Sequence, residues 1–330
     1  MASEDQTASR LTVLLALAMN ALIAAAKLVV GAVSGSSAML AEGAHSVADT
    51  VNEVFLLTSL RRSSRPPDSK HPFGYGAERF FWSLLAAIGI FLSGAVFSAY
   101  QAFRALTESG SGQHSYIWSY AVLGLAFVAE GVSWVRSVIQ LRGEAKAAGH
   151  GFFDHLRRTR DPTVKTVFSE DAAALVGIGI AAAAVGLHQA TGNQRWDALG
   201  AAMISVLLTF VAFYLGRHNM ALLTGQSADP TLRQQLWNEL MAVPEVDAVV
   251  EVLTMHIGAD EILLAARLDL ADGLTSDDIE DVSSHIAHAI SARHPDVTQV
   301  FLDATRASEH ERERAHRLTA PHGGTSSSNM

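Results

Sequence analysis

The chain has 330 residues, of which 49% are hydrophobic and only 17% are charged. Ordinary soluble domains carry about 25% charged residues, so the deficit indicates that part of the chain lies in lipid. The sequence has no cysteine, which excludes disulfides, thiolate metal sites and cysteine nucleophiles.

The net charge of −9 is unevenly distributed along the chain. Residues 1–228 carry 17 Lys and Arg against 15 Asp and Glu, whereas residues 229–330 carry 7 against 18. An acidic chain argues against a nucleic-acid partner, and the asymmetry predicts a near-neutral apolar body followed by an acidic, soluble one.

Six apolar stretches in the first body are each long enough for a transmembrane helix, which needs about 20 residues. They cover about 11–33, 37–60, 80–106, 116–141, 164–188 and 196–223. Lys and Arg gather after the second and fourth stretches, so the positive-inside rule predicts that both termini are cytoplasmic. No transit peptide precedes the first stretch, and we therefore expect a multi-pass protein of a prokaryotic plasma membrane.

The pattern changes after Asp229 and Pro230. It predicts a helix over 231–241, strands over 246–256 and 262–270, a helix over 276–293 and a strand over 297–303. This α-β-β-α-β order is typical of a small ferredoxin-like α+β domain. We therefore divide the chain into an N-terminus (1–10), a six-helix membrane domain (11–228), an α+β domain (229–306) and a disordered tail (307–330).

Ionisable residues are costly inside a membrane, and by default they mark a site or a pathway. The second stretch carries Glu42, His45, Asp49 and Glu53 on one helical face. His45 and Asp49 are four residues apart, which places their Cβ atoms roughly 5–6 Å from each other. An imidazole nitrogen and a carboxylate oxygen at that spacing can bind one divalent cation.

The fifth stretch carries Glu170 and Asp171 near its start. Neighbouring residues on a helix point about 100° apart, so one of the two carboxylates completes the site, and we favour Asp171. The alternative is that these groups form a buried hydrogen-bond network between helices. Polar groups of the transport pathway are expected at Glu42, Glu53, Asn20 and Glu130, and helix packing is the other interpretation of Asn20. Lys27 is expected to snorkel towards the membrane surface.

Two segments carry a family resemblance. The segment Ala41–Thr50 (AEGAHSVADT) and the segment His71–Phe80 (HPFGYGAERF), with six helices and an α+β tail, resemble the cation diffusion facilitator family of metal exporters. The segments FSEDAAAL at 168–175 and MHIGADE at 255–261 are most like its zinc transporter 9-like branch.

The resemblance implies a homodimer that binds metal between the second and fifth helices and exchanges it for protons. It also implies secondary metal positions at Asp68, His71 and His256. The family usually has a further ligand four residues before Asp171, where this chain has Val167. Asp171 with water, or Glu170, must then replace that ligand.

The sequence therefore predicts a Zn²⁺/H⁺ antiporter that works by alternating access and needs no cofactor beyond its transported cation. Metal binding requires neutral imidazole and ionised carboxylate, so it displaces protons. An exporter of Mn²⁺ or Fe²⁺, and a membrane metal sensor that does not transport, remain alternatives. An enzyme is not expected, because no nucleophile and base are suitably spaced.

Overall fold

The computed structural model describes residues 2–107, 116–147, 149, 151–153, 156 and 162–308. The side chains of residues 2–16, 147 and 162–167 lie outside this description, and so does the predicted disordered tail beyond Ser308. The chain divides into two compact units, residues 1–221 and residues 222–330.

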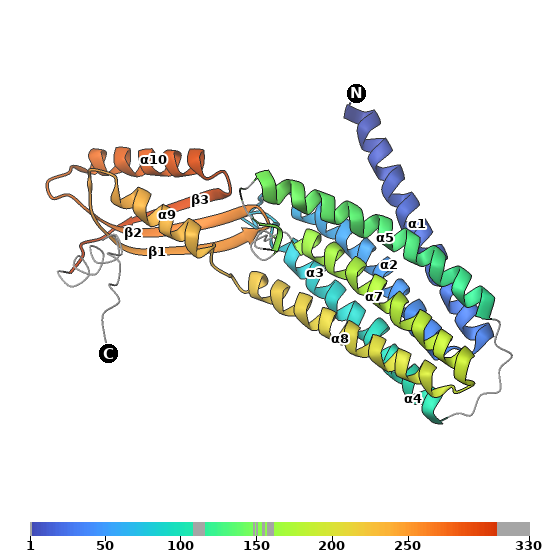
Figure 1. The fold of residues 1–330 in the computed structure, drawn as a ribbon. Helices are drawn as coiled ribbons and strands as arrows, with labels where there is room; N and C mark the ends of the chain where they lie inside the picture. The colour runs from blue at the N-terminus through green and yellow to red at the C-terminus, as the bar shows by residue number, and fades with distance from the viewer. Residues whose placement is uncertain are drawn as a thin grey trace, which may run out of the picture. The chain divides into compact units, whose positions relative to one another are not determined.

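The first unit is a bundle of long helices (Figure 1). Its helical segments are α1 (Ala2–Ser34), α2 (Ser37–Ser63), α3 (Glu78–Gly89), η1 (Ile90–Val96), α4 (Phe97–Thr107), α5 (Tyr116–Ala147), α7 (Pro162–Thr191) and α8 (Arg195–Leu223). Because α3, η1 and α4 follow one another without a break, the helices correspond to the predicted apolar stretches.

Within the described residues, five segments are long and apolar enough to cross a membrane. They are Leu17–Ser34, Glu78–Thr107, Tyr116–Lys146, Phe168–Thr191 and Arg195–Leu223. Helix α2 has 27 residues, which is long enough, but its polar residues lower its mean hydropathy. It packs against α1, α3, α4 and α7, so its polar face is shielded by other helices.

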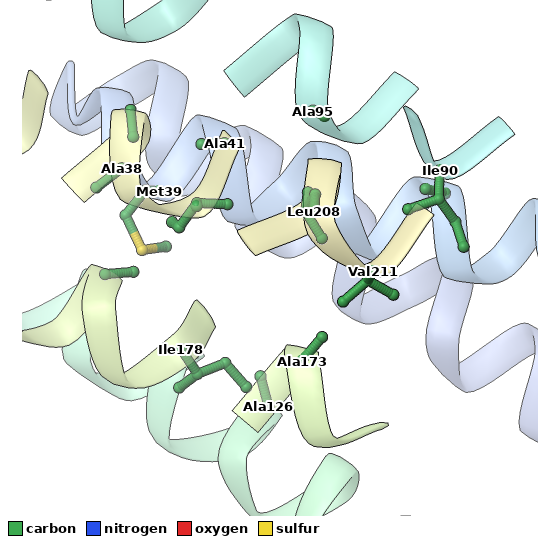
Figure 2. Packing of buried hydrophobic residues seen from close by; sticks show 14 of the residues in the cluster. Ala38, Met39, Ala41, Ile90, Ala95, Ala126, Ala173, Ile178, Leu208 and Val211 are labelled. Carbon is green, nitrogen blue, oxygen red and sulfur yellow. The ribbon is translucent and has the colours of Figure 1, made fainter. Parts of the chain in front are cut away.

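The bundle core is rich in alanine, which lets helix backbones approach closely in lipid (Figure 2). Ala38 and Met39 of α2 belong to the same cluster as Ala173 of α7 and Leu208 of α8. The sequence did not predict that η1 is a π-helical turn in the third segment. There the hydroxyl of Ser205 donates a hydrogen bond of 2.8 Å to the carbonyl of Ala95.

A tight turn joins α1 to α2. Gly35 adopts a φ of +69°, a conformation that glycine accommodates without strain. Ser36 then caps α2, because its hydroxyl accepts a hydrogen bond of 3.2 Å from the backbone N–H of Met39. The turn sets α1 and α2 antiparallel, and Gly31 and Gly43 lie tightly against Leu40 and Leu28 across the pair.

The second unit has the predicted α-β-β-α-β order. It consists of α9 (Pro230–Met241), β1 (Val246–Gly258), β2 (Glu261–Leu270), α10 (Ser276–Arg293) and β3 (Val297–Ala304). The sheet order is β1-β2-β3, with β1 antiparallel and β3 parallel to β2. Leu236 and Leu240 of α9 and Ile286 and Ile290 of α10 pack with Leu264 of the sheet in one core. The mainly helical membrane fold with a small α+β domain is therefore confirmed.

Candidate metal-transport site

His45 and Asp49 face each other on α2, as their spacing predicts. His45 Nδ1 lies 3.3 Å from Asp49 Oδ1, and the His45 side chain is 1% exposed. Apart from this contact, neither ring nitrogen of His45 nor Oδ1 of Asp49 makes a hydrogen bond with the described residues. Buried polar atoms that lack hydrogen bonds are costly, so these atoms are suited to receive a ligand.

A polar cavity of about 260 Å³ lies beside this pair, between α1, α2, α5 and α7. Its polar lining residues are Asn20, Asp49, Glu53, Glu130, Ser133, Arg136, Glu170 and Asp171. The cavity thus gathers five carboxylates around one guanidinium group, and it is strongly anionic wherever those carboxylates are ionised. His45 does not line the cavity but adjoins it through Asp49.

Several of the carboxylates are held by hydrogen bonds from neighbouring helices. The amide of Asn20 donates to Glu53 at 2.6 Å, and the hydroxyl of Ser133 donates to Asp171 at 2.8 Å. The amide of Asn52 donates to one oxygen of Glu170, whose other oxygen makes no hydrogen bond with the described part of the chain. Of the predicted residues, Asp49 and Glu53 of α2 and Glu170 and Asp171 of α7 are therefore brought together around one cavity.

In this conformation the described side chains contain no group of three His, Asp or Glu residues close enough to hold a metal ion. Asp49, Glu170 and Asp171 share the cavity without converging on one point. The position of Val167, the residue that replaces a family ligand, has its side chain outside the described part of the chain.

The secondary positions differ in their surroundings. Asp68 Oδ1 lies 3.6 Å from His71 Nδ1, between α2 and α3. The hydroxyl of Tyr75 donates to Asp68 Oδ2 at 2.7 Å, and the backbone N–H groups of Lys70 and His71 donate to Oδ1. The Tyr75 hydrogen bond, followed by that from His71, lowers the pKa of Asp68 below its ordinary value.

In the second unit, His256 is buried in β1. On the opposite face of the same sheet, Arg267 Nε lies 3.3 Å from Asp303 Oδ2. The Asp303 carboxylate is therefore already paired with the positive charge of Arg267.

Glu42 and Lys27 depart from what the sequence predicted. Glu42 does not line the cavity, and Lys27 does not snorkel. Both side chains are fully buried, and Lys27 Nζ lies 3.0 Å from Glu42 Oε1. The signal was present in the turn at residues 34–36, since an antiparallel pair centred there places residue 27 beside residue 42.

Ser133 and Arg136 were also missed, although they follow Glu130 at intervals of three residues, which puts them on its helical face.

The fold and this cavity define a multi-pass membrane protein with a polar, carboxylate-lined site inside its helical bundle. Residues 13–224 match the cation efflux transmembrane domain. The chain therefore belongs to the cation efflux family, which consists of transporters and not of enzymes, as the sequence predicted.

Three relatives illustrate the range of the family. The human protein "Proton-coupled zinc antiporter SLC30A9, mitochondrial" is 33% identical over 78% of this chain and 45% of its own length. Metal tolerance protein C4 of Arabidopsis thaliana is 33% identical over 80% of this chain and 58% of its own length. Manganese efflux system protein MneP of Bacillus subtilis is 28% identical over 92% of this chain and 97% of its own length.

This chain spans about half the length of the SLC30A9 relatives that it matches, 45–46% of their residues. These comparisons support the predicted zinc transporter 9-like branch. They contradict the prediction of a prokaryotic plasma membrane with both termini cytoplasmic, because the animal relatives are named as mitochondrial proteins.

Proposed function

We propose that the chain exports a divalent metal cation in exchange for protons, and that this cation is Zn²⁺. The observation that carries the proposal is the facing pair His45 and Asp49 beside the carboxylate-lined cavity, whose nitrogen and Oδ1 atoms make no hydrogen bond with the described residues. The names of the relatives support it, since they describe a proton-coupled zinc antiporter and a manganese efflux protein.

The chemistry of these groups accounts for coupling. Zn²⁺ binds neutral imidazole nitrogen and ionised carboxylate oxygen at about 2.0–2.2 Å, so the cation and the protons compete for the same atoms. In the proposed cycle, deprotonated His45, Asp49 and Asp171 bind the cation, and the bundle then changes which side of the membrane the site faces. Protons enter as the cation leaves, and the protonated site returns.

Glu170 is proposed as the replacement for the ligand that Val167 lacks, with water as the other candidate. Its Oε1 atom has no hydrogen-bond partner among the residues that the structure describes, whereas a carboxylate with a purely structural role is expected to have both oxygens hydrogen-bonded. Glu53, Glu130 and Asn20, which line the same cavity, are proposed to attract and conduct the cation rather than to hold it.

The site is tested by metal flux in proteoliposomes with an imposed proton gradient. His45→Ala and Asp49→Ala are each expected to abolish proton-driven Zn²⁺ uptake while the protein still inserts. Thr58→Ala is the matched control on α2, because its exposed hydroxyl donates a hydrogen bond to the carbonyl of Val54 in its own helix. Normal flux in both site variants would refute the assignment.

Metal identity is tested in the same vesicles by competition among Zn²⁺, Mn²⁺, Fe²⁺ and Co²⁺. The oxygen-rich lining is also compatible with Mn²⁺ or Fe²⁺, so a preference for one of these would replace Zn²⁺ in the proposal. Binding of metal without flux would instead identify a sensor.

We further propose a homodimer in which the α+β domain, residues 229–306, supplies a contact. The sheet face opposite α9 and α10 carries a row of registered neighbours, Leu253, Ala265 and Phe301. Leu253 and Phe301 are 56% and 50% exposed, which leaves an apolar strip open to a second copy. Leu253→Glu is expected to shift the mass of the purified protein towards the monomer in light scattering, and an unchanged dimer mass would remove this contact.

Asp68 and His71 are proposed as a weak secondary metal position, because both oxygens of Asp68 already accept hydrogen bonds. His256 is proposed not to hold metal strongly. The Asp303 carboxylate is paired with Arg267 on the opposite face of the sheet, so it does not lie beside His256. Zinc titration of wild type and of Asp68→Asn measures the first position, and an identical number of bound ions in both would exclude it.

A further inference from the structure

Lys27 of α1 and Glu42 of α2 form an ion pair in the interior of the bundle. Lys27 Nζ lies 3.0 Å from Glu42 Oε1 and also donates to the hydroxyl oxygen of Ser46 at 2.7 Å. Both charged side chains are 0% exposed. Burying two charges costs about as much as their attraction returns, so stability alone is a weak reason for such a pair.

The second oxygen of Glu42 is not used by the pair. Glu42 Oε2 has no hydrogen-bond partner among the described atoms. It points to α7, where a Cβ atom added to Gly177 would lie only 2.5 Å from it. A fully buried carboxylate oxygen therefore stands between the two helices that carry the proposed ligands.

Glu42 is also one helical turn from His45. Residues three apart on a helix have Cβ atoms roughly 5–6 Å from each other, so Glu42 lies on the same side of α2 as the proposed metal ligand. Carboxylate oxygen is a good ligand for divalent cations, and for Mn²⁺ in particular. Glu42 differs from the proposed ligands of α2 in that its carboxylate is paired with Lys27.

We propose that Lys27 is a resident counter-ion that sets the metal preference of the site. By neutralising Glu42, it keeps this carboxylate from joining His45 and Asp49 in binding the cation. Lys27 is thus a specificity-determining residue that acts through Glu42 without touching the metal. The proposal rests on the proposed function, because it assumes that His45 and Asp49 bind the transported cation.

Removing the charge of Lys27 and removing the charge of Glu42 should have opposite effects on metal binding. Lys27→Gln leaves the Glu42 carboxylate without a counter-ion and adds an oxygen ligand to the site, which favours Mn²⁺ over Zn²⁺. Glu42→Gln leaves the Lys27 ammonium group uncompensated near His45, and this charge repels either cation. Lys27→Gln with Glu42→Gln removes both charges and brings the preference back towards wild type.

The test is calorimetric titration of the full chain in detergent micelles with ZnCl₂ and with MnCl₂. Changes in groups that orient metal ligands alter affinity roughly 10–100-fold, so Lys27→Gln should shift the Mn²⁺/Zn²⁺ affinity ratio about tenfold towards Mn²⁺. Glu42→Gln should weaken both metals by about the same factor. Lys27→Arg keeps the charge and should keep the wild-type ratio.

The sign of the effects separates this role from a purely structural one. If Lys27→Gln and Glu42→Gln change affinity in the same direction, or leave the ratio unchanged, the proposal is wrong. If Lys27→Gln does not fold, tighter binding by the double variant than by Glu42→Gln supports the proposal, and equal binding overturns it. Absence of metal binding by the wild-type chain would refute the proposed function itself.

Discussion

The hydroxyl of Ser36 donates a hydrogen bond of 2.7 Å to Asp197 Oδ1, which links the α1–α2 turn to the first turn of α8. The other oxygen of Asp197 contacts His188 Nδ1 near the end of α7. All three side chains are buried. Ser36 is 17 residues from Glu53 on α2, or roughly 25 Å along a helix, so this cluster joins the helices at the end remote from the cavity.

Asp197→Ala is therefore expected to destabilise the bundle. It leaves Ser36 and His188 without a shared acceptor, which costs about 1–3 kcal/mol in the free energy of unfolding. Equilibrium unfolding in mixed micelles measures the change. Tyr120→Phe is the control, because it removes only the exposed 3.2 Å bond to Gln189 and should change stability by less than about 0.5 kcal/mol. Equal losses of stability in Asp197→Ala and Tyr120→Phe would show that the buried cluster contributes no more to stability than one exposed hydrogen bond.

Two glycines of α7 provide a matched pair. A Cβ atom at residue 177 would meet Glu42 Oε2 at 2.5 Å, whereas one at residue 179 meets nothing within 4 Å. Gly177→Ala should destabilise the protein by about 1–3 kcal/mol, because either the buried Glu42 carboxylate must turn away from residue 177, which disturbs its pair with Lys27, or α7 must shift from α2. Gly179→Ala should be neutral or stabilise it by up to about 1 kcal/mol, since alanine favours helix more than glycine. Thermal unfolding in micelles ranks the two, and the reverse order would contradict the close approach of α2 and α7.

The sequence predicted the elements well because each has its own local signal. Apolar length marks the spanning helices, and the Thr275 capping box fixes the start of α10. It did not predict the π-turn η1, in which the carbonyl of Ala95 accepts a hydrogen bond from Ser205 of the distant helix α8. Local patterns carry no information on such distant partners.

The same limit explains what was missed at the site. Spacing on α2 predicted that His45 and Asp49 face each other, which is a property of one helix. Whether Lys27 snorkels or pairs depends on which residue of α2 lies opposite, and pairing with Glu42 hides it from the membrane surface. The separation of Glu42 from the cavity likewise follows from the packing of α1 and α7 around α2.

Asp68 offers a prediction outside the membrane segments. Its pKa is lowered chiefly by the Tyr75 hydroxyl, so Tyr75→Phe should raise it towards the ordinary value of about 3.9. A carboxyl whose pKa is depressed in the folded state stabilises that state at any pH above its unfolded-state pKa. This stabilisation is lost as the pH falls through the folded-state pKa. In the variant the contribution should be smaller, and its loss should be complete at a higher pH.

Carbon NMR of labelled aspartate follows the titration. The internal control is Asp278, whose pKa is lowered by the hydrogen bond from Thr275 and should be unaffected. An unchanged Asp68 titration in Tyr75→Phe would mean that the hydroxyl does not hold this carboxylate in solution.

The last prediction concerns the ligand that the family has and this chain lacks. Val167 precedes Asp171 by four residues in α7, a spacing that puts both on one face of the helix. Val167→His should add an imidazole nitrogen to an oxygen-rich site, and nitrogen ligands favour Zn²⁺ over Mn²⁺. The Zn²⁺/Mn²⁺ flux ratio in proteoliposomes should therefore rise. Gln189→His is the control, because it adds a histidine to the same helix roughly 27 Å from Asp171. A ratio that does not change in Val167→His would mean that residue 167 does not face the transported ion, and Glu170 or water would then have to complete the site without help from that position.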